Sequence, residues 1–203
     1  MNQTVVVRLL RQKSELECAM GFMKAIAHEK HRTDPPPLPQ FLFGAYRGSG
    51  ICGTIGVDFG SDEKPFHLER HWEFDSSQTP LPFERSKMAE IGRWMAKQPG
   101  VSVILFYAAT LFSLSHRKVY CLAEMKPKIA EHSMSIGYEM LKVQPAELLS
   151  GRISKEQRGY YLENPPSLYM LRLEQMHQVI RPATPPFTDV KFEFLIIDEE
   201  EKI

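Results

Sequence analysis

The sequence is organised around one apolar run, Met88-Ala89-Glu90-Ile91-Gly92-Arg93-Trp94-Met95-Ala96. Side chains of a strand alternate between two faces, so Glu90 should share a face with Gly92 and Trp94, and Arg93 should point the other way. A glutamate among apolar neighbours costs free energy unless it is paired or has a chemical task. The nearby glycine leaves room for another molecule beside the backbone. The run therefore predicts a strand that forms the floor of an active site.

The composition is that of an ordinary globular protein, with 203 residues, 43% of them hydrophobic and 25% charged. Its formal net charge of zero argues against nucleic acid or an anionic membrane as partner. Three scattered cysteines without a CxxC pair favour neither a disulfide framework nor a zinc site, and they indicate a reducing compartment. No apolar run has the length of a transmembrane helix. We therefore expect a cytoplasmic protein without a metal site.

Hydrophobic periodicity and helix-end signals divide the chain into elements. Ser14 and Glu17 have the spacing of a capping box, Ser102 stands where a cap would stand, and Gly137 is typical of a helix end. The patterns predict helices over 14–31, 103–114 and 127–136. They predict strands over 4–10, 41–46, 51–59, 88–96, 119–123, 168–173 and 190–197. Irregular chain is predicted over 60–87, within which 66–74 fit either a short strand or a short helix, and over 150–161 and 181–186. This order predicts an α/β (α+β) fold whose mixed central sheet has helices on both faces.

Several short phrases resemble the GNAT superfamily of N-acyltransferases. They are the hairpin over 43–57, the turn Ile136-Gly137-Tyr138, and Glu90-Ile91-Gly92-Arg93, which is similar to the Glu-x-Ser-Arg signature of acyl-homoserine-lactone synthases and N-acyl amino acid synthases. The resemblance implies a single GNAT-like acyltransferase domain over 1–203, with its core at about 4–175. It leaves an extra strand and an acidic tail over 187–203. Leu68-Glu69 and Gly159-Tyr160-Tyr161 also look like the thermostable-haemolysin family, which has the same core.

The resemblance implies transfer of an acyl group from an acyl thioester to the amine of a small acceptor such as an amino acid. The donor would be acyl-CoA or an acyl carrier protein (acyl-ACP), used as co-substrate, with no permanently bound cofactor. Glu90 would be the catalytic base, and Arg93 and Glu69 would orient the substrate, with Arg93 pairing either with Glu69 or with a substrate carboxylate. The donor would bind at six residues of the strand and the following loop, namely Gly92, Trp94, Met95, Ala96, Gly100 and Ser102.

Each of these residues also has a purely structural interpretation. Glu90 and Arg93 fit buried ion pairs, Gly92 fits a strand bulge, and Ser102 fits an ordinary helix cap. The loop over 97–102 lacks one glycine of the superfamily's pyrophosphate loop, and Ser133 stands where many acetyltransferases have a tyrosine acid. These departures favour an alternative function, a non-catalytic GNAT-like protein that binds a lipid or acyl ligand or acts like a haemolysin.

Overall fold

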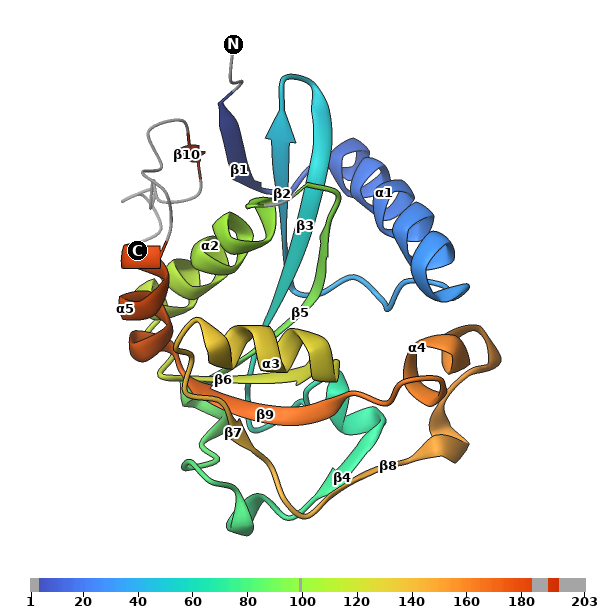
Figure 1. Cartoon of the computed structure of the whole chain (residues 1–203), viewed down its shortest axis with the longest axis vertical. Coiled ribbons are helices and arrows are strands. Elements are labelled where there is room, and N and C mark those ends of the chain that lie inside the picture. The colour runs from blue at the N-terminus through green and yellow to red at the C-terminus, as the bar shows by residue number, and fades with distance from the viewer. Residues whose placement is uncertain (1–3, 99, 184–189, 194–203) are drawn as a thin grey trace.

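The computed structural model describes residues 4–98, 100–183 and 190–193. Within them one large mixed sheet has the strand order β10-β1-β2-β3-β5-β6-β9-β7 (Figure 1). Its strands are β1 (Val5–Leu9), β2 (Phe41–Arg47), β3 (Gly50–Phe59), β5 (Met88–Ala96), β6 (Tyr120–Met125), β7 (Leu141–Lys142), β9 (Ser167–Arg172) and β10 (Val190–Phe192). A small second sheet pairs β4 (Trp72–Phe74) with β8 (Ala146–Leu148).

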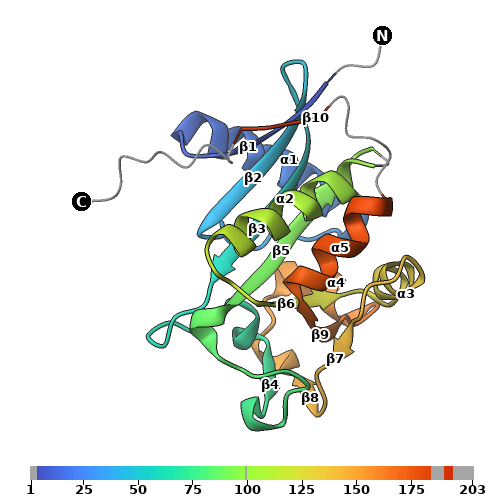
Figure 2. The ribbon, with the colours of Figure 1, turned by 90° about the vertical axis from the view of Figure 1, so that its left-hand side faces the viewer.

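Helices cover both faces of the large sheet, as the sequence predicts. They are α1 (Lys13–His31), α2 (Val101–Ser115), α3 (Pro127–Ser135), α4 (Arg158–Leu162) and α5 (Leu173–Ala183). In Figure 2, α2 and α5 lie in front of the sheet and α1 lies behind it. The α2 face holds the largest hydrophobic cluster, centred on residues such as Leu105 and Phe106, and α1 covers a smaller one with Met23 and Ile26.

The pairing of β5 with its two neighbours positions the site. β5 runs antiparallel to β3 along most of its length, but it runs parallel to β6 for only three residue pairs. The last of these joins Glu90 to Leu122, although both strands continue beyond it. A parallel pair needs a crossover connection, and α2 provides it. In the described residues β5 and β6 therefore separate in the middle of the sheet, just after Glu90.

The helices α1 and α2 begin at other residues than predicted. The first helix begins at Lys13, and the Glu15 carboxylate accepts the backbone N–H of Gln12 at 3.1 Å, so Ser14 lies in the first turn and the predicted Ser14–Glu17 box is wrong. The second helix begins at Val101 after Gly100, whose φ of 82° favours glycine. Ser102 therefore lies in the first turn and is not the cap.

The helix α5 and the short strands β7 and β8 were not predicted, whereas residues 66–74, which fitted a short strand or helix, contain both η1 (Leu68–Arg70) and β4. Residues 173–183 form α5 because Leu173, Met176 and Ile180 recur at helical spacing and are all buried. The predicted connection over 150–161 contains the beginning of α4, and residues 60–87 are irregular apart from β4 and short 3₁₀ turns such as η1. The last predicted strand is described only as β10, and residues 184–189 and 194–203 lie outside the described residues.

Candidate active site

A bulge in β5 shapes the site. Met95 pairs with Thr54 and Gly92 with Gly56, so two residues of β5 oppose a single residue of β3. Arg93 lies in the bulge with a φ of 52°. The prediction that strand alternation continues to residue 96 is therefore wrong. The bulge turns Arg93 onto the face of Glu90, and the following side chains change faces with it.

Glu90 is almost completely buried, with 4% of its surface exposed. Its Oε1 lies 3.2 Å from Nη1 of Arg93, and its Oε2 accepts the backbone N–H of Leu68 at 3.2 Å. Burial raises the pKa of Glu90 to about 7, although Arg93 opposes the rise. A carboxylate with this pKa exchanges a proton readily near neutral pH, which a general base requires.

Arg93 is fixed by several partners in addition to Glu90. Its Nη1 lies 2.8 Å from Oδ2 of Asp58, and its Nε donates to the carbonyl oxygen of Pro37 at 3.1 Å. The predicted pairing of Arg93 with Glu69 is wrong, because Glu69 forms a two-bond ion pair with Arg85. Arg93 and Glu90 are thus parts of one buried network, to which Asp58 contributes a carboxylate that the sequence did not single out.

Open space lies above Gly92, beside Glu90. A Cβ added to Gly92 would meet no heavy atom within 4 Å, and the residue is partly exposed. Its neighbours on β3 differ, since a Cβ at Gly53 would lie 2.7 Å from Leu105 and one at Gly56 would lie 2.7 Å from Pro39. Gly92 was expected to leave room for another molecule, and the structure leaves this room where β5 and β6 separate.

The other predicted donor-binding residues do not lie together. Trp94 faces α2, where its ring stacks on Phe106 with centroids 4.8 Å apart and its Nε1 donates to the Ser102 carbonyl at 3.2 Å. Ala96 also packs against the α2 cluster, whereas Met95 packs against the α1 cluster. Trp94 and Ser102 are therefore joined at the start of α2, next to Gly100. The first backbone N–H groups of a helix have no partner within it and attract anions.

A second carboxylate near Glu90 was not predicted from the sequence. Glu124 of β6 accepts Nε1–H of Trp72 at 3.1 Å on Oε2 and the hydroxyl of Tyr161 at 2.9 Å on Oε1. Burial raises the pKa of Glu124, and its charge contributes to the raised pKa of Glu90. A signal was present, because Glu124 interrupts an apolar strand in the same way as Glu90 does.

Two further features of the described residues bear on ligands. No three His, Cys, Asp or Glu side chains among them converge in a way that could hold a metal ion. A cavity of about 700 Å³ opens between β4, β8 and the start of β9, with Trp72, Val143, Pro145 and Leu168 in its wall. Trp72 lines this cavity and also donates its Nε1–H to Glu124.

By sequence, the chain matches no protein-family model and no curated protein. By structure, it resembles BjaI, a CoA-dependent acyl-homoserine lactone synthase solved with SAM and isopentyl-CoA, with a TM-score of 0.63 at 13% identity over 95% of this chain and 94% of that one. It also resembles FeeM, an N-acyl amino acid synthase from uncultured soil microbes, with a TM-score of 0.58 at 14% identity over 86% and 94% of the two chains. The chain has the GNAT fold.

An acetyltransferase of the GNAT family from Staphylococcus aureus shares the GNAT fold with a TM-score of 0.50 at 10% identity, over 82% of this chain and 99% of that one. The predicted resemblance to the superfamily, near its lactone synthases and amino acid synthases, is confirmed at the level of the fold. At these identities the likeness shows the fold alone. Among the described residues, no helix is both long and apolar enough to cross a membrane.

Proposed function

We propose that this protein is an N-acyltransferase that moves an acyl group from an acyl thioester to the amine of a small acceptor such as an amino acid. The observation that carries the proposal is Glu90, a buried carboxylate with a pKa of about 7 that lies beside the open space above Gly92. The GNAT fold supports it, because the similar structures include a lactone synthase and an amino acid synthase.

In the proposed reaction, Glu90 accepts a proton from the acceptor's ammonium group, directly or through a water molecule. The freed amine attacks the thioester carbonyl, a C–N bond forms, the C–S bond breaks, and the thiolate leaves and takes up a proton. Arg93 and the N–H of Leu68 hold the Glu90 carboxylate in place. Glu69 positions Glu90 indirectly, because it accepts the N–H of Phe66 at 2.6 Å at the start of the turn that carries Leu68.

The donor would lie where β5 has separated from β6. Its pantetheine amides would bond to the free edge of β5 near Gly92, and its phosphates would approach the first N–H groups of α2 after Gly100. The isopentyl-CoA bound to BjaI supports a CoA thioester as donor, and acyl-ACP offers the same pantetheine arm. Cys18, Cys52 and Cys121 are free thiols, which fits the proposed cytoplasmic location.

The test is release of free thiol from acyl-CoA of graded chain length in the presence of pooled amino acids. Glu90→Gln should lower turnover by roughly a hundredfold or more, as loss of a general base does, while circular dichroism stays unchanged. The matched control is Glu73→Gln, which neutralises an exposed carboxylate on β4 and should keep full activity. Equal turnover of Glu90→Gln and the wild type would falsify the base assignment.

The pH profile provides a second readout. Because the base must be ionised, kcat/KM should rise with pH and bend near the pKa of Glu90, about 7. The alternative, a non-catalytic lipid-binding or haemolysin-like protein, predicts a different result. Native mass spectrometry would then detect a retained lipid, and no thiol would be released with any donor.

A further inference from the structure

We propose that Glu124 binds the acceptor as a cation, so that the acceptor of this protein is a positively charged amine bearing a second polar group. This inference rests on the proposed function and names the part of the site that would recognise the acceptor. It is carried by the placement of Glu124, by its hydrogen-bond partners, and by a buried histidine without a partner beside it.

The register of the sheet places Glu124 at the open space. Glu90 lies opposite Leu122 in the parallel ladder, so the next residues on the same face are Gly92 of β5 and Glu124 of β6. The ladder ends before it reaches them, and Gly92 has no side chain to fill the gap. Glu124 therefore borders the open space from one side and Glu90 from the other, and Glu124 is itself partly exposed.

The partners of Glu124 leave it ready to accept a cation. Each of its oxygens accepts one bond from a neutral donor, Trp72 or Tyr161, and each oxygen keeps a free lone pair. Among the described residues, Glu124 takes part in no ion pair, whereas Glu90 and Asp58 are both paired with Arg93. The charges of Arg93 and Lys126 act on Glu124 without an ion pair to it, so a bound ammonium group would give this carboxylate a direct cationic partner.

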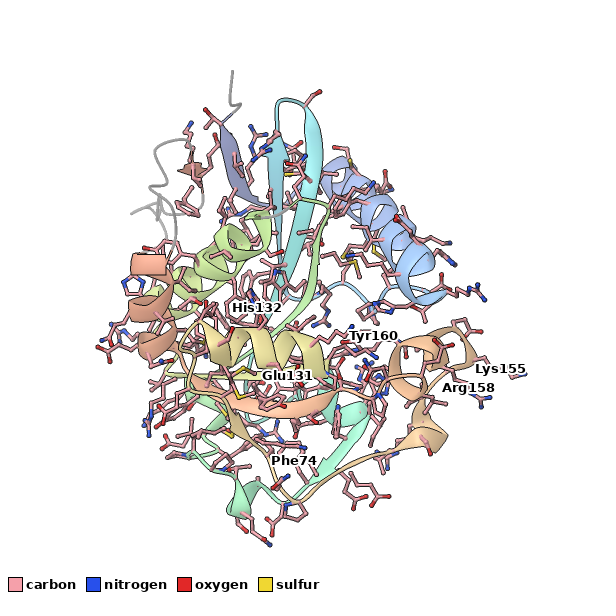
Figure 3. The ribbon with its side chains drawn as sticks, in the orientation of Figure 1. Phe74, Glu131, His132, Lys155, Arg158 and Tyr160 are labelled. Carbon is pink, nitrogen blue, oxygen red and sulfur yellow. The ribbon has the colours of Figure 1, made fainter. Side chains whose placement is uncertain are left out.

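The walls of this corner also suit a cation. Tyr160 and Tyr161 pack edge to face with centroids 5.0 Å apart, and Nζ of Lys126 already lies 4.2 Å from the centre of the Tyr160 ring. In Figure 3, Tyr160 lies on the side of α4 that faces the sheet, and Lys155 and Arg158 point away. Aromatic faces attract cations, and the Lys126 ammonium over the Tyr160 ring shows that this corner accommodates a positive charge.

His71 supplies the second polar contact. Its side chain is buried, with 7% of the residue exposed, and its two ring nitrogens have no hydrogen-bond partner in the described structure. Its ring lies 5.2 Å from that of Tyr161, the residue that bonds Glu124. Burial lowers the pKa of His71, so the neutral ring offers one donor and one acceptor. A hydroxyl or carbonyl group of the acceptor could satisfy either of them.

The experiment is a calorimetric titration with three probes that share a four-carbon chain, without any thioester. Butylamine carries the charge, 1-butanol is its neutral counterpart, and 4-amino-1-butanol adds a second polar group. The wild type should bind butylamine more tightly than 1-butanol by roughly tenfold to a hundredfold, the range expected for a charged hydrogen bond. Glu124→Gln should abolish this preference, and Glu124→Asp, which keeps the charge, should retain most of it.

The matched control is Glu147→Gln, which removes an exposed carboxylate on β8 and should leave the preference unchanged. His71→Phe should abolish only the additional affinity for 4-amino-1-butanol. A wild type without preference for the cation, or a Glu124→Gln variant that keeps it, would overturn the inference. Because no thioester is present, cation binding without acyl transfer would disprove the proposed function alone, and acyl transfer without this binding would disprove the inference alone.

Discussion

Nη1 of Arg93 lies 3.2 Å from Oε1 of Glu90, although the two residues are three positions apart in one strand. Residues at this spacing in a regular strand point to opposite faces. The bulge of β5, in which Arg93 has a φ of 52°, brings them to the same side. The backbone irregularity therefore creates the ion pair that holds the proposed base.

Arg93→Met should destabilise the protein strongly. Its side chain is only 3% exposed and neutralises both Glu90 and Asp58, so its removal leaves two carboxylates with no cation at this position. Breaking a buried ion pair in this way costs about 3–5 kcal/mol of the free energy of unfolding. Urea denaturation measures this loss. The control Lys13→Met, which breaks an exposed ion pair with Glu17, should cost less than about 1 kcal/mol. A similar small cost for both variants would contradict the prediction.

The stability of the protein should depend on the protonation of Glu90. Its pKa rises from 4.5 in the unfolded chain to about 7 in the folded protein, so the folded protein holds the proton more tightly. This contribution is fully present below pH 4.5 and is lost as the pH rises through 7. At 1.36 kcal/mol per pKa unit, it amounts to roughly 3 kcal/mol.

Glu90→Gln should lack this decline, so the difference in unfolding free energy between wild type and variant should fall by that amount between pH 4.5 and pH 7. The variant must be subtracted from the wild type at each pH, because His67 titrates in an overlapping pH range. Burial lowers the pKa of His67 to about 3, so its contribution to the free energy of unfolding rises with pH, whereas that of Glu90 falls. A difference that stays constant with pH would show that Glu90 keeps an ordinary pKa.

Gly92→Ala should weaken substrate binding and leave the stability of the fold nearly unchanged. The added Cβ meets no atom within 4 Å, so the free energy of unfolding should change by less than about 1 kcal/mol, and KM for donor or acceptor should rise as the methyl group enters the site. Gly53→Ala is the counterpart, since its Cβ would lie 2.7 Å from Leu105 and should cost about 1–3 kcal/mol. If even Gly92→Phe leaves the kinetics unchanged, the space above Gly92 does not hold substrate.

Local patterns predicted most elements because their causes lie within a few residues. The hairpin of β2 and β3 has a glycine-rich turn between two strand-like runs, and α2 is apolar on nearly every side. The helix α5 could have been predicted from the spacing of Leu173, Met176 and Ile180. The strands β7 and β8 could not, because two or three residues carry too little periodicity to distinguish them from loop.

The site was predictable up to the bulge. Glu90 and Gly92 share a face because β5 is regular over 88–92, and Arg93, Trp94 and Ala96 were assigned to the wrong faces because it is irregular afterwards. A bulge is a mismatch between two paired strands, so it depends on the register of β5 against β3. Residues 88–96 by themselves carry no information on that register.

The sequence by itself determined the strand at 88–96, the buried carboxylate within it and the fold class, because alternation, burial and helix-end chemistry act over short distances. Only the tertiary structure decided that Arg93 meets Glu90, that Glu69 pairs with Arg85, and that Glu124 accepts hydrogen bonds from Trp72 and Tyr161. Apart from the Arg93–Glu90 pair, which the bulge creates, these contacts join segments that are distant along the chain. Their geometry follows from how the sheet is paired and where β5 and β6 separate.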